Sequence, residues 1–190
     1  MTSAAEPKSS PISSSAKPSL LSRLFGAKAD DHGAVRPLWH AIVAAARARE
    51  WYAPDGQPGI ADTLAGRFDA ITLVLSLALL RMEGIEELRL PSVRLTELFV
   101  TDMDGQLRES GVGDLVVGKH IGRLMSVLGG RLGAYRAALA GDEDLAAALE
   151  RNLTLAPGAD LAALARGARE LADHLAGLDD AALLEGKIGP

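Results

Sequence analysis

Apolar residues recur along most of this chain at steps of three and four residues rather than alternating with polar ones. Such spacing is typical of amphipathic α-helices, and no stretch shows the period of two that a half-buried strand requires. We therefore predict an all-α protein, a single bundle of about six to eight helices. The predicted helices span residues 36–52, 63–82, 91–109, 114–140, 142–153 and 160–177, and a terminal turn spans residues 179–185.

The second of these segments contains the longest apolar run. Residues 70–80 are interrupted only by Thr72 and Ser76 and are closed by Arg81. A transmembrane helix needs about 20 apolar residues, so this run is too short to cross a bilayer. We expect it to be the core helix of the bundle, with Asp62 or Thr63 capping its start.

Glycine and proline mark the predicted connections. Residues 53–61 (APDGQPGIA) hold enough of both to form a loop. Gly111 and Gly113 predict a structural turn after the third helix, because a tight turn needs positive φ or a close backbone approach. The glycines within 129–133 predict a kink or a division in the fourth helix.

The N-terminal part differs from the rest in composition. The first 19 residues are rich in Ser, Pro, Ala and Lys without a long apolar run, which predicts a disordered tail and not a secretory signal. We assign residues 1–34 to this flexible N-terminal tail. Residues 19–28 (SLLSRLFGAK) form a short amphipathic segment inside this tail. Three interpretations of this segment are open, namely contact with anionic lipid, docking on the domain and disorder.

Charge separates the C-terminal part from the middle. Residues 35–139 hold 12 acidic and 12 basic residues, whereas residues 140–190 hold 10 acidic and 4 basic residues. We assign residues 35–153 to the main helical domain and residues 154–190 to an acidic helical extension.

The overall composition excludes several kinds of functional site and partner. The 190 residues, 48% of them hydrophobic, suffice for one full-sized domain with a stable core. The absence of cysteine excludes disulfides, thiolate nucleophiles and Cys-based metal sites. A formal net charge of −5 argues against general coating of nucleic acid, and DNA is not an expected partner. Arg outnumbers Lys, and Ala, Leu and Gly are abundant, which fits a GC-rich bacterial genome. Because the N-terminal residues do not form a secretory signal, we expect a cytoplasmic protein.

The most informative stretch runs from Thr101 to His120 (TDMDGQLRESGVGDLVVGKH), where a charged helix end meets the two glycines and a basic helix. Asp102 lies at the edge of the apolar stripe, where it either caps the following turn or meets a partner. The polar residues that flank the predicted turn are the candidate partner-binding residues: Asp102, Glu109, Asp114, Lys119 and Arg123.

The fourth helix is basic along its length. Lys119, His120, Arg123, Arg131 and Arg136 follow Asp114, and the next acidic residue is Asp142. This basic face, Lys119 to Arg136, is either a solvated helix surface or a docking surface for acidic peptide loops or ribosomal RNA. A helical adaptor or a ribosome-binding or RNA-binding module is therefore the alternative function.

Motifs for catalysis are incomplete. The stretch from Gly113 to His120 (GDLVVGKH) has His120 where a phosphate-binding loop needs Ser or Thr for magnesium, and the preceding segment is helical rather than a strand. A calcium loop with Gly105 at its sixth position would place Val100 and Gly111 where carboxylates are required. The four histidines are scattered, and no G-x-S-x-G motif is present. We expect no enzyme activity, no metal, no cofactor and no small-molecule substrate.

The chain contains three segments, residues 49–82, 98–125 and 130–153, which in this order resemble the ubiquinol-cytochrome c chaperone family of bc1 complex assembly factors. The resemblance covers Val35 to Leu153, and its most specific part lies between Asp102 and Asp114. That part includes Asp102, Met103, Asp104, Leu107, Arg108, Glu109, Gly111, Val112, Gly113 and Asp114. Further matching points are Trp51-Tyr52, Asp62-Thr63, Arg67-Phe68-Asp69, Tyr135 and Arg151-Asn152-Leu153.

The resemblance implies an all-helical, non-enzymatic factor that holds newly made cytochrome b, a haem-carrying membrane protein, during its maturation. Mitochondrial members are said to work with a small partner protein near the ribosomal exit tunnel. This chain lacks an Arg-rich transit segment, and its acidic part after Pro157 has no counterpart in the resemblance. The implied protein is bacterial and visits the inner membrane from the cytoplasmic side.

Overall fold

The computed structural model describes residues 32–109 and 117–189, apart from the side chains of residues 106–121. Over these residues the chain forms eight α-helices and one 3-10 turn, with no strand, and the predicted all-α fold is confirmed. The elements are α2 (Arg36–Ala45), α3 (Arg49–Tyr52), η1 (Pro54–Gly56), α4 (Leu64–Met82), α5 (Glu86–Glu109), α6 (Val117–Ala140), α7 (Leu145–Asn152), α8 (Leu161–Gly177) and α9 (Asp180–Leu184).

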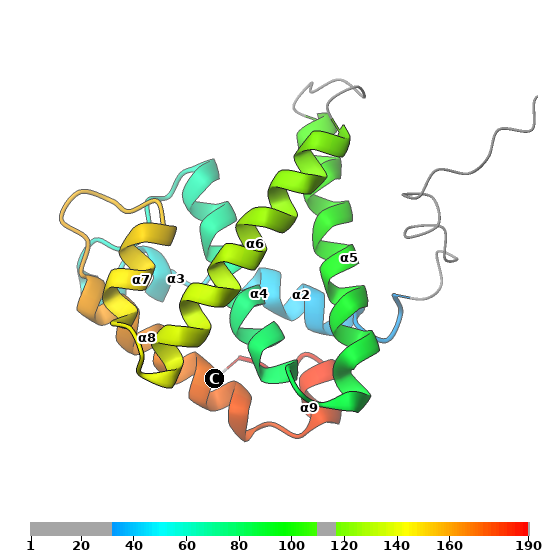
Figure 1. Ribbon diagram of the computed structural model, residues 1–190. Helices are drawn as coiled ribbons and strands as arrows, with labels where there is room; N and C mark the ends of the chain where they lie inside the picture. Colours follow the sequence, from blue (N-terminus) through cyan, green and yellow to red (C-terminus); the bar gives the residue numbers. More distant parts are fainter. Residues whose placement is uncertain (1–31, 110–116, 190) are drawn as a thin grey trace, which may run out of the picture.

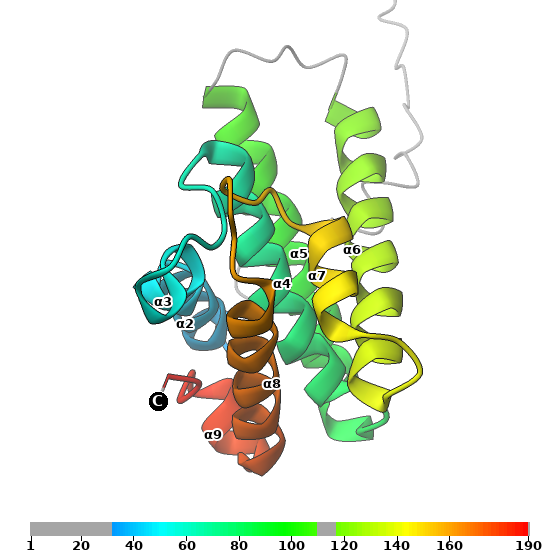
Figure 2. The ribbon, with the colours of Figure 1, turned by 90° about the vertical axis from the view of Figure 1, so that its left-hand side faces the viewer.

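Helix α4 is the core helix, as its apolar run predicts. It runs through the middle of the molecule and contacts α2, α5, α6 and α8 (Figures 1 and 2). Leu73, Val74 and Leu75 are consecutive and completely buried, so neighbouring helices cover α4 on several sides. A helix that is apolar nearly all round needs such an environment.

Side-chain caps start four of the helices. Thr63 accepts a hydrogen bond from the Gly66 amide at 3.1 Å and so begins α4, which confirms one of the two predicted caps. Asp144, Asp160 and Asp179 cap α7, α8 and α9 in the same way. Part of the acidic excess of the C-terminal residues therefore satisfies helix N-termini.

The first predicted helix, 36–52, is divided into α2 and α3. Ala48 is extended (φ −60°, ψ 140°) and interrupts the helical backbone. Trp51 donates from Nε1 to the Ala45 carbonyl at 2.9 Å, and the Tyr52 hydroxyl donates to the Ala46 carbonyl at 3.0 Å. These side chains bind carbonyls at the end of α2, which stabilises the break, and the Ala45 carbonyl also accepts from the Ala48 amide at 3.1 Å.

The predicted start of the third helix at Pro91 is wrong, because α5 begins at Glu86. Leu88 is 1% exposed and lies two turns before Leu95 on the buried stripe that Leu95 shares with Phe99. Burial of Leu88 thus extends the helix ahead of Pro91, which is accommodated in its second turn.

No kink or division occurs at the glycines of residues 129–133, because α6 is continuous from Val117 to Ala140. Gly129 and Gly130 are exposed, whereas Leu128 and Tyr135 are buried on the inner side. Packing of the inner face offsets the weak helix propensity of the glycines.

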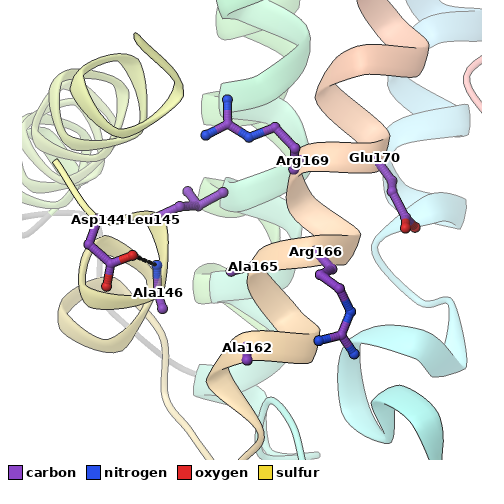
Figure 3. Close-up of a pocket in the computed structure, with 8 residues that line it drawn as sticks. All are labelled: Asp144, Leu145, Ala146, Ala162, Ala165, Arg166, Arg169 and Glu170. Carbon is purple, nitrogen blue, oxygen red and sulfur yellow. Dashed lines mark hydrogen bonds between the residues drawn. The ribbon is translucent and has the colours of Figure 1, made fainter. Parts of the chain in front are cut away.

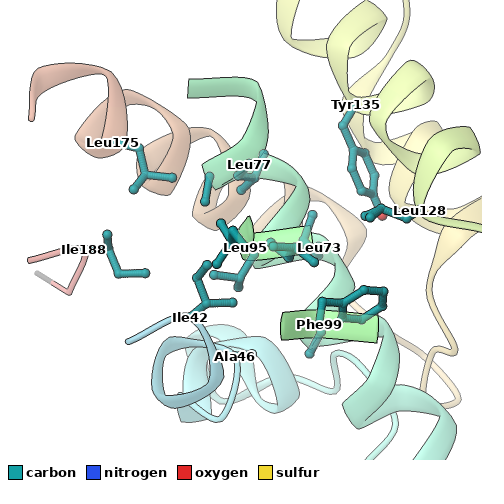
Figure 4. Close-up of a cluster of buried hydrophobic side chains, with 14 of the residues drawn as sticks. Ile42, Ala46, Leu73, Leu77, Leu95, Phe99, Leu128, Tyr135, Leu175 and Ile188 are labelled. Carbon is teal, nitrogen blue, oxygen red and sulfur yellow. The ribbon is translucent and has the colours of Figure 1, made fainter. Parts of the chain in front are cut away.

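The C-terminal helices pack on the same core as the rest. Leu175 of α8 and Ile188 point towards the side chains of Ile42, Leu77 and Leu95 (Figure 4). Arg81 of α4 donates to the Leu175 carbonyl at 3.0 Å and to the Leu178 carbonyl at 2.7 Å, and it pairs with Asp180 at 2.9 Å.

Candidate functional site

The C-terminal end of α5 and the start of α6, near which the predicted partner-binding residues fall in the sequence, lie at the top of Figure 1. Gly111, Gly113 and Asp114 lie outside the described residues, and so do the side chains of Glu109 and Lys119. The predicted structural turn and these contacts stay predictions. Two of the five candidate side chains, Asp102 on α5 and Arg123 on α6, are described, and both are exposed.

Asp102 accepts a hydrogen bond from Nε1 of Trp39, with 2.5 Å between the nitrogen and Oδ2. Trp39 is 2% exposed and belongs to α2, so this contact connects α2 to the C-terminal half of α5. Because Asp102 remains exposed, the same carboxylate is accessible to a partner. Its role in the fold is to satisfy a buried indole N–H.

The basic face predicted for the fourth helix is only partly exposed. Arg131 is 9% exposed and pairs with Asp69 inside the bundle. Arg136 makes two hydrogen bonds to the carboxylate of Glu83, at 2.9 and 2.7 Å. Arg123 and Arg136 are exposed on the described part of this face, and Arg136 is held by Glu83. The expectation of a continuous basic surface is therefore wrong at Arg131.

Aromatic rings continue from Trp39 into the interior. The Trp39 and Phe99 rings meet edge to face with centroids 6.2 Å apart, and Phe68 and Phe99 meet at the same distance with tilted planes. The Arg131 guanidinium lies 5.6 Å from the Phe68 ring centroid, within range of a cation–π interaction. These contacts link α2, α5, α4 and α6 beneath the candidate surface.

Asp69 ends this row of contacts as a buried hub. Its Oδ1 accepts from Arg131 Nη2 at 2.5 Å, and its Oδ2 accepts from both the amide and the hydroxyl of Thr154 at 2.7 Å. The carboxylate is thereby satisfied by three donors although Asp69 is only 6% exposed. Asp69 connects α4, α6 and the segment after α7 at one point.

The segment after α7 also pairs with the loop before α4. The Ala61 amide donates to the Thr154 carbonyl at 2.9 Å, and the Ala156 amide donates to the Gly59 carbonyl at 2.9 Å. A Cβ on Gly59 would lie 2.4 Å from the Trp51 carbonyl oxygen, so glycine is required for this close approach.

Two polar atoms beside the hub are buried without a hydrogen-bond partner among the described residues: Arg131 Nη1 and the Tyr135 hydroxyl. Burial raises the pKa of the Tyr135 phenol well above its ordinary value, and Arg131 only partly opposes this effect. Tyr135 is therefore a neutral phenol throughout the physiological pH range.

Sequence reasoning did not identify Asp69 and Arg131 as a pair. The available signal was Asp69 itself, an acidic residue within a helix whose centre is apolar. Buried acids are almost always paired, so Asp69 called for a basic partner. Sequence alone offers several arginines and no means of choosing among them.

An open depression lies between α7 and α8, with Leu145, Ala162 and Ala165 on its walls (Figure 3). Its two arginines are engaged in the fold. Arg166 pairs with Asp55 at 2.7 Å, and Arg169 donates to the last carbonyls of α6, those of Ala138 and Leu139, at 3.1 and 2.9 Å.

Within residues 32–109 and 117–189, no group of three or more His, Asp or Glu side chains is placed to hold a metal ion. None of the helices in this part of the chain is both long and apolar enough to span a bilayer.

Known proteins resemble the chain over most of its length. The model of the ubiquinol-cytochrome C chaperone family matches residues 57–189, which includes the acidic C-terminal part. The crystal structure of the Cbp3 homologue from Brucella abortus superposes with a TM-score of 0.70 at 34% identity, over 90% of this chain and 96% of that one. No curated protein matches the sequence. With the family model covering well over half of its residues, the chain belongs to the ubiquinol-cytochrome c chaperone family.

Proposed function

We propose that this protein is a non-enzymatic chaperone that binds newly made cytochrome b during assembly of the respiratory bc1 complex. The family match over residues 57–189 is the observation that carries this proposal. The structural similarity to the Cbp3 homologue supports it across nearly the whole chain.

The contact surface in this proposal is the end of the α5–α6 pair, with Asp102, Glu109, Asp114, Lys119 and Arg123. The row of contacts from Trp39 to Asp69 holds α2, α4, α5 and α6 together. A rigid helical scaffold can present a preformed surface to a client without losing conformational entropy on binding.

The setting that we propose is the cytoplasm, with peripheral contact at the inner membrane where cytochrome b is inserted. A small partner protein and the ribosome are further proposed contacts, taken from the family resemblance. The alternative, RNA binding through the basic face, receives less support because Arg131 and Arg136 are paired within the protein.

The test is deletion of the gene and measurement of b-type haem spectra and bc1 activity in membranes. We expect both to fall and the intact gene to restore them. Normal b-type haem and normal bc1 activity in the deletion strain would contradict the proposal.

Charge reversal then tests the surface. Lys119→Glu with Arg123→Glu should lower co-purification of cytochrome b and bc1 activity while the protein remains folded. The matched control is Arg47→Glu with Arg49→Glu, which makes the same charge change at two exposed residues beside α3. Equal effects of the two double variants would show that net charge, and not this surface, matters.

A further inference from the structure

The outer face of α5 carries a small apolar patch. Leu90 is 55% exposed and Val93 is 51% exposed. Because they are three residues apart in a helix, their side chains are neighbours. We call Leu90 and Val93 the α5 patch. Other large apolar side chains exposed in the described part of the chain, Leu64 and Met125, lie on α4 and α6.

His32 holds the start of the described chain on this same face. Its Nε2 lies 3.1 Å from Oε2 of Glu97. Glu97 follows Leu90 by seven residues and Val93 by four, so all three share one stripe of α5. At the rise of an α-helix, Glu97 is about 6 Å from Val93 and about 10 Å from Leu90 along the axis.

The residues that precede His32 include apolar side chains within reach of the patch. Leu24 and Phe25 belong to the amphipathic segment 19–28 and precede His32 by eight and seven residues. Seven extended residues can span about 23 Å, which is more than twice the distance from Glu97 to Leu90 along the helix.

Charges follow a complementary order. The stripe of α5 passes from the patch to the exposed acids Glu86 and Glu87, one turn before Leu90, and Glu86 pairs with Arg89 at 3.3 Å. The chain read backwards from His32 passes Asp31, Asp30 and Lys28 before it reaches Phe25, Leu24 and Arg23. An anchor at Glu97 would thus bring apolar residues to the patch and a basic residue to the acids.

We propose that residues 19–28 dock on the α5 patch of their own chain, with Leu24 and Phe25 covering Leu90 and Val93 and with Arg23 beside Glu87. The short connection to His32 makes the docking intramolecular, which gives the segment an effective concentration in the millimolar range. The segment is then a cover for an apolar surface, and its apolar face is unavailable to lipid while it is docked. This inference does not depend on the identity of the client.

Paramagnetic relaxation in the full-length chain tests the proposal. The protein has no cysteine, so Ser22→Cys provides a single spin-label site on the polar side of the segment. We expect the amides of residues 89, 90 and 92–94 to lose most of their NMR intensity. Adding Leu24→Glu and Phe25→Glu, or Leu90→Glu and Val93→Glu, should restore that intensity. Leu64→Glu is the matched control, because Leu64 is 80% exposed on α4, and it should leave the loss unchanged.

Three outcomes would overturn the proposal. Weak broadening spread evenly over the surface would show that the segment has no preferred position. Broadening in a mixture of spin-labelled chains and isotope-labelled, cysteine-free chains would identify a second copy as the occupant. An unaffected α5, with the segment ordered only by phosphatidylglycerol vesicles, would identify a lipid surface as the target of the segment.

Discussion

Asp69 of α4 and Arg131 of α6 form an ion pair inside the bundle, with 2.5 Å between Oδ1 and Nη2. The two side chains are 8% and 11% exposed. Removing two charges from water is costly, and the cost is offset here by the pair itself, by two hydrogen bonds from Thr154 and by the Phe68 ring. The pair therefore specifies one arrangement of α4, α6 and the segment at Thr154.

Replacing one partner of this pair should lower the stability of the protein far more than replacing both. Asp69→Ala leaves the Arg131 charge buried and uncompensated, and we expect the free energy of unfolding to fall by about 3–5 kcal/mol. The double variant Asp69→Ala, Arg131→Met should be more stable than Asp69→Ala alone. Urea unfolding of the two variants measures the difference, and an additive loss in the double variant would contradict the role of the pair.

Substitution of alanine for glycine should have opposite effects on stability at Gly66 and Gly130. A Cβ on Gly66 would lie 1.9 Å from the Ala61 carbonyl oxygen, so Gly66→Ala must displace the loop before α4 and should cost about 1–3 kcal/mol. Gly130 is a helical residue of α6 with no atom within 4 Å of its added Cβ. Gly130→Ala should therefore stabilise the protein by about 1 kcal/mol. Thermal unfolding distinguishes the two signs, and a stabilising Gly66→Ala would refute the close approach.

Tyr135 should tolerate loss of its hydroxyl but not of its ring. The buried hydroxyl has no partner among the described residues, so Tyr135→Phe should leave stability unchanged or raise it by about 1 kcal/mol. Tyr135→Ala should cost about 3–5 kcal/mol, because a completely buried ring is lost. A loss above about 1 kcal/mol in Tyr135→Phe would mean that the hydroxyl makes a hydrogen bond.

The Glu83–Arg136 pair predicts a small pH dependence. Hydrogen bonding from Arg136 lowers the pKa of Glu83 below its ordinary value of 4.5. A lowered carboxyl pKa favours the folded state above that ordinary value, and the contribution disappears as the pH falls through the lowered pKa. Both side chains are about half exposed, so Glu83→Gln should cost at most about 0.5 kcal/mol at pH 7. Unfolding curves of the two proteins should converge at low pH, and a constant difference would exclude this linkage.

The spacing of apolar residues was sufficient to predict most helices. The predicted segments 63–82, 142–153 and 160–177 correspond to α4, α7 and α8, whereas the predicted terminal turn 179–185 is the short helix α9. Each of these four helices starts at a side-chain cap that is readable locally. The division at Ala48 was not predictable in this way, since hydrogen bonds from the Trp51 and Tyr52 side chains stabilise it.

Candidate site residues were chosen for polarity and for nearness to a predicted turn. Those criteria identify exposed groups such as Arg123, but they do not reveal that Asp102 holds the indole of Trp39, 63 residues away. The run of basic residues from Lys119 to Arg136 predicted an exposed face that includes Arg131, although the Arg131 guanidinium lies inside against Asp69.

The sequence by itself determined the helical class, the core helix, the caps and the family, because each depends on residues close together in the chain or on the order of whole segments. Tertiary structure alone decided which arginine neutralises Asp69, where Pro91 and the α6 glycines are tolerated, and how α8 and α9 complete the core. The physical reason is that burial and ion pairing between distant residues depend on packing between helices, and single-helix periodicity carries no information about that packing.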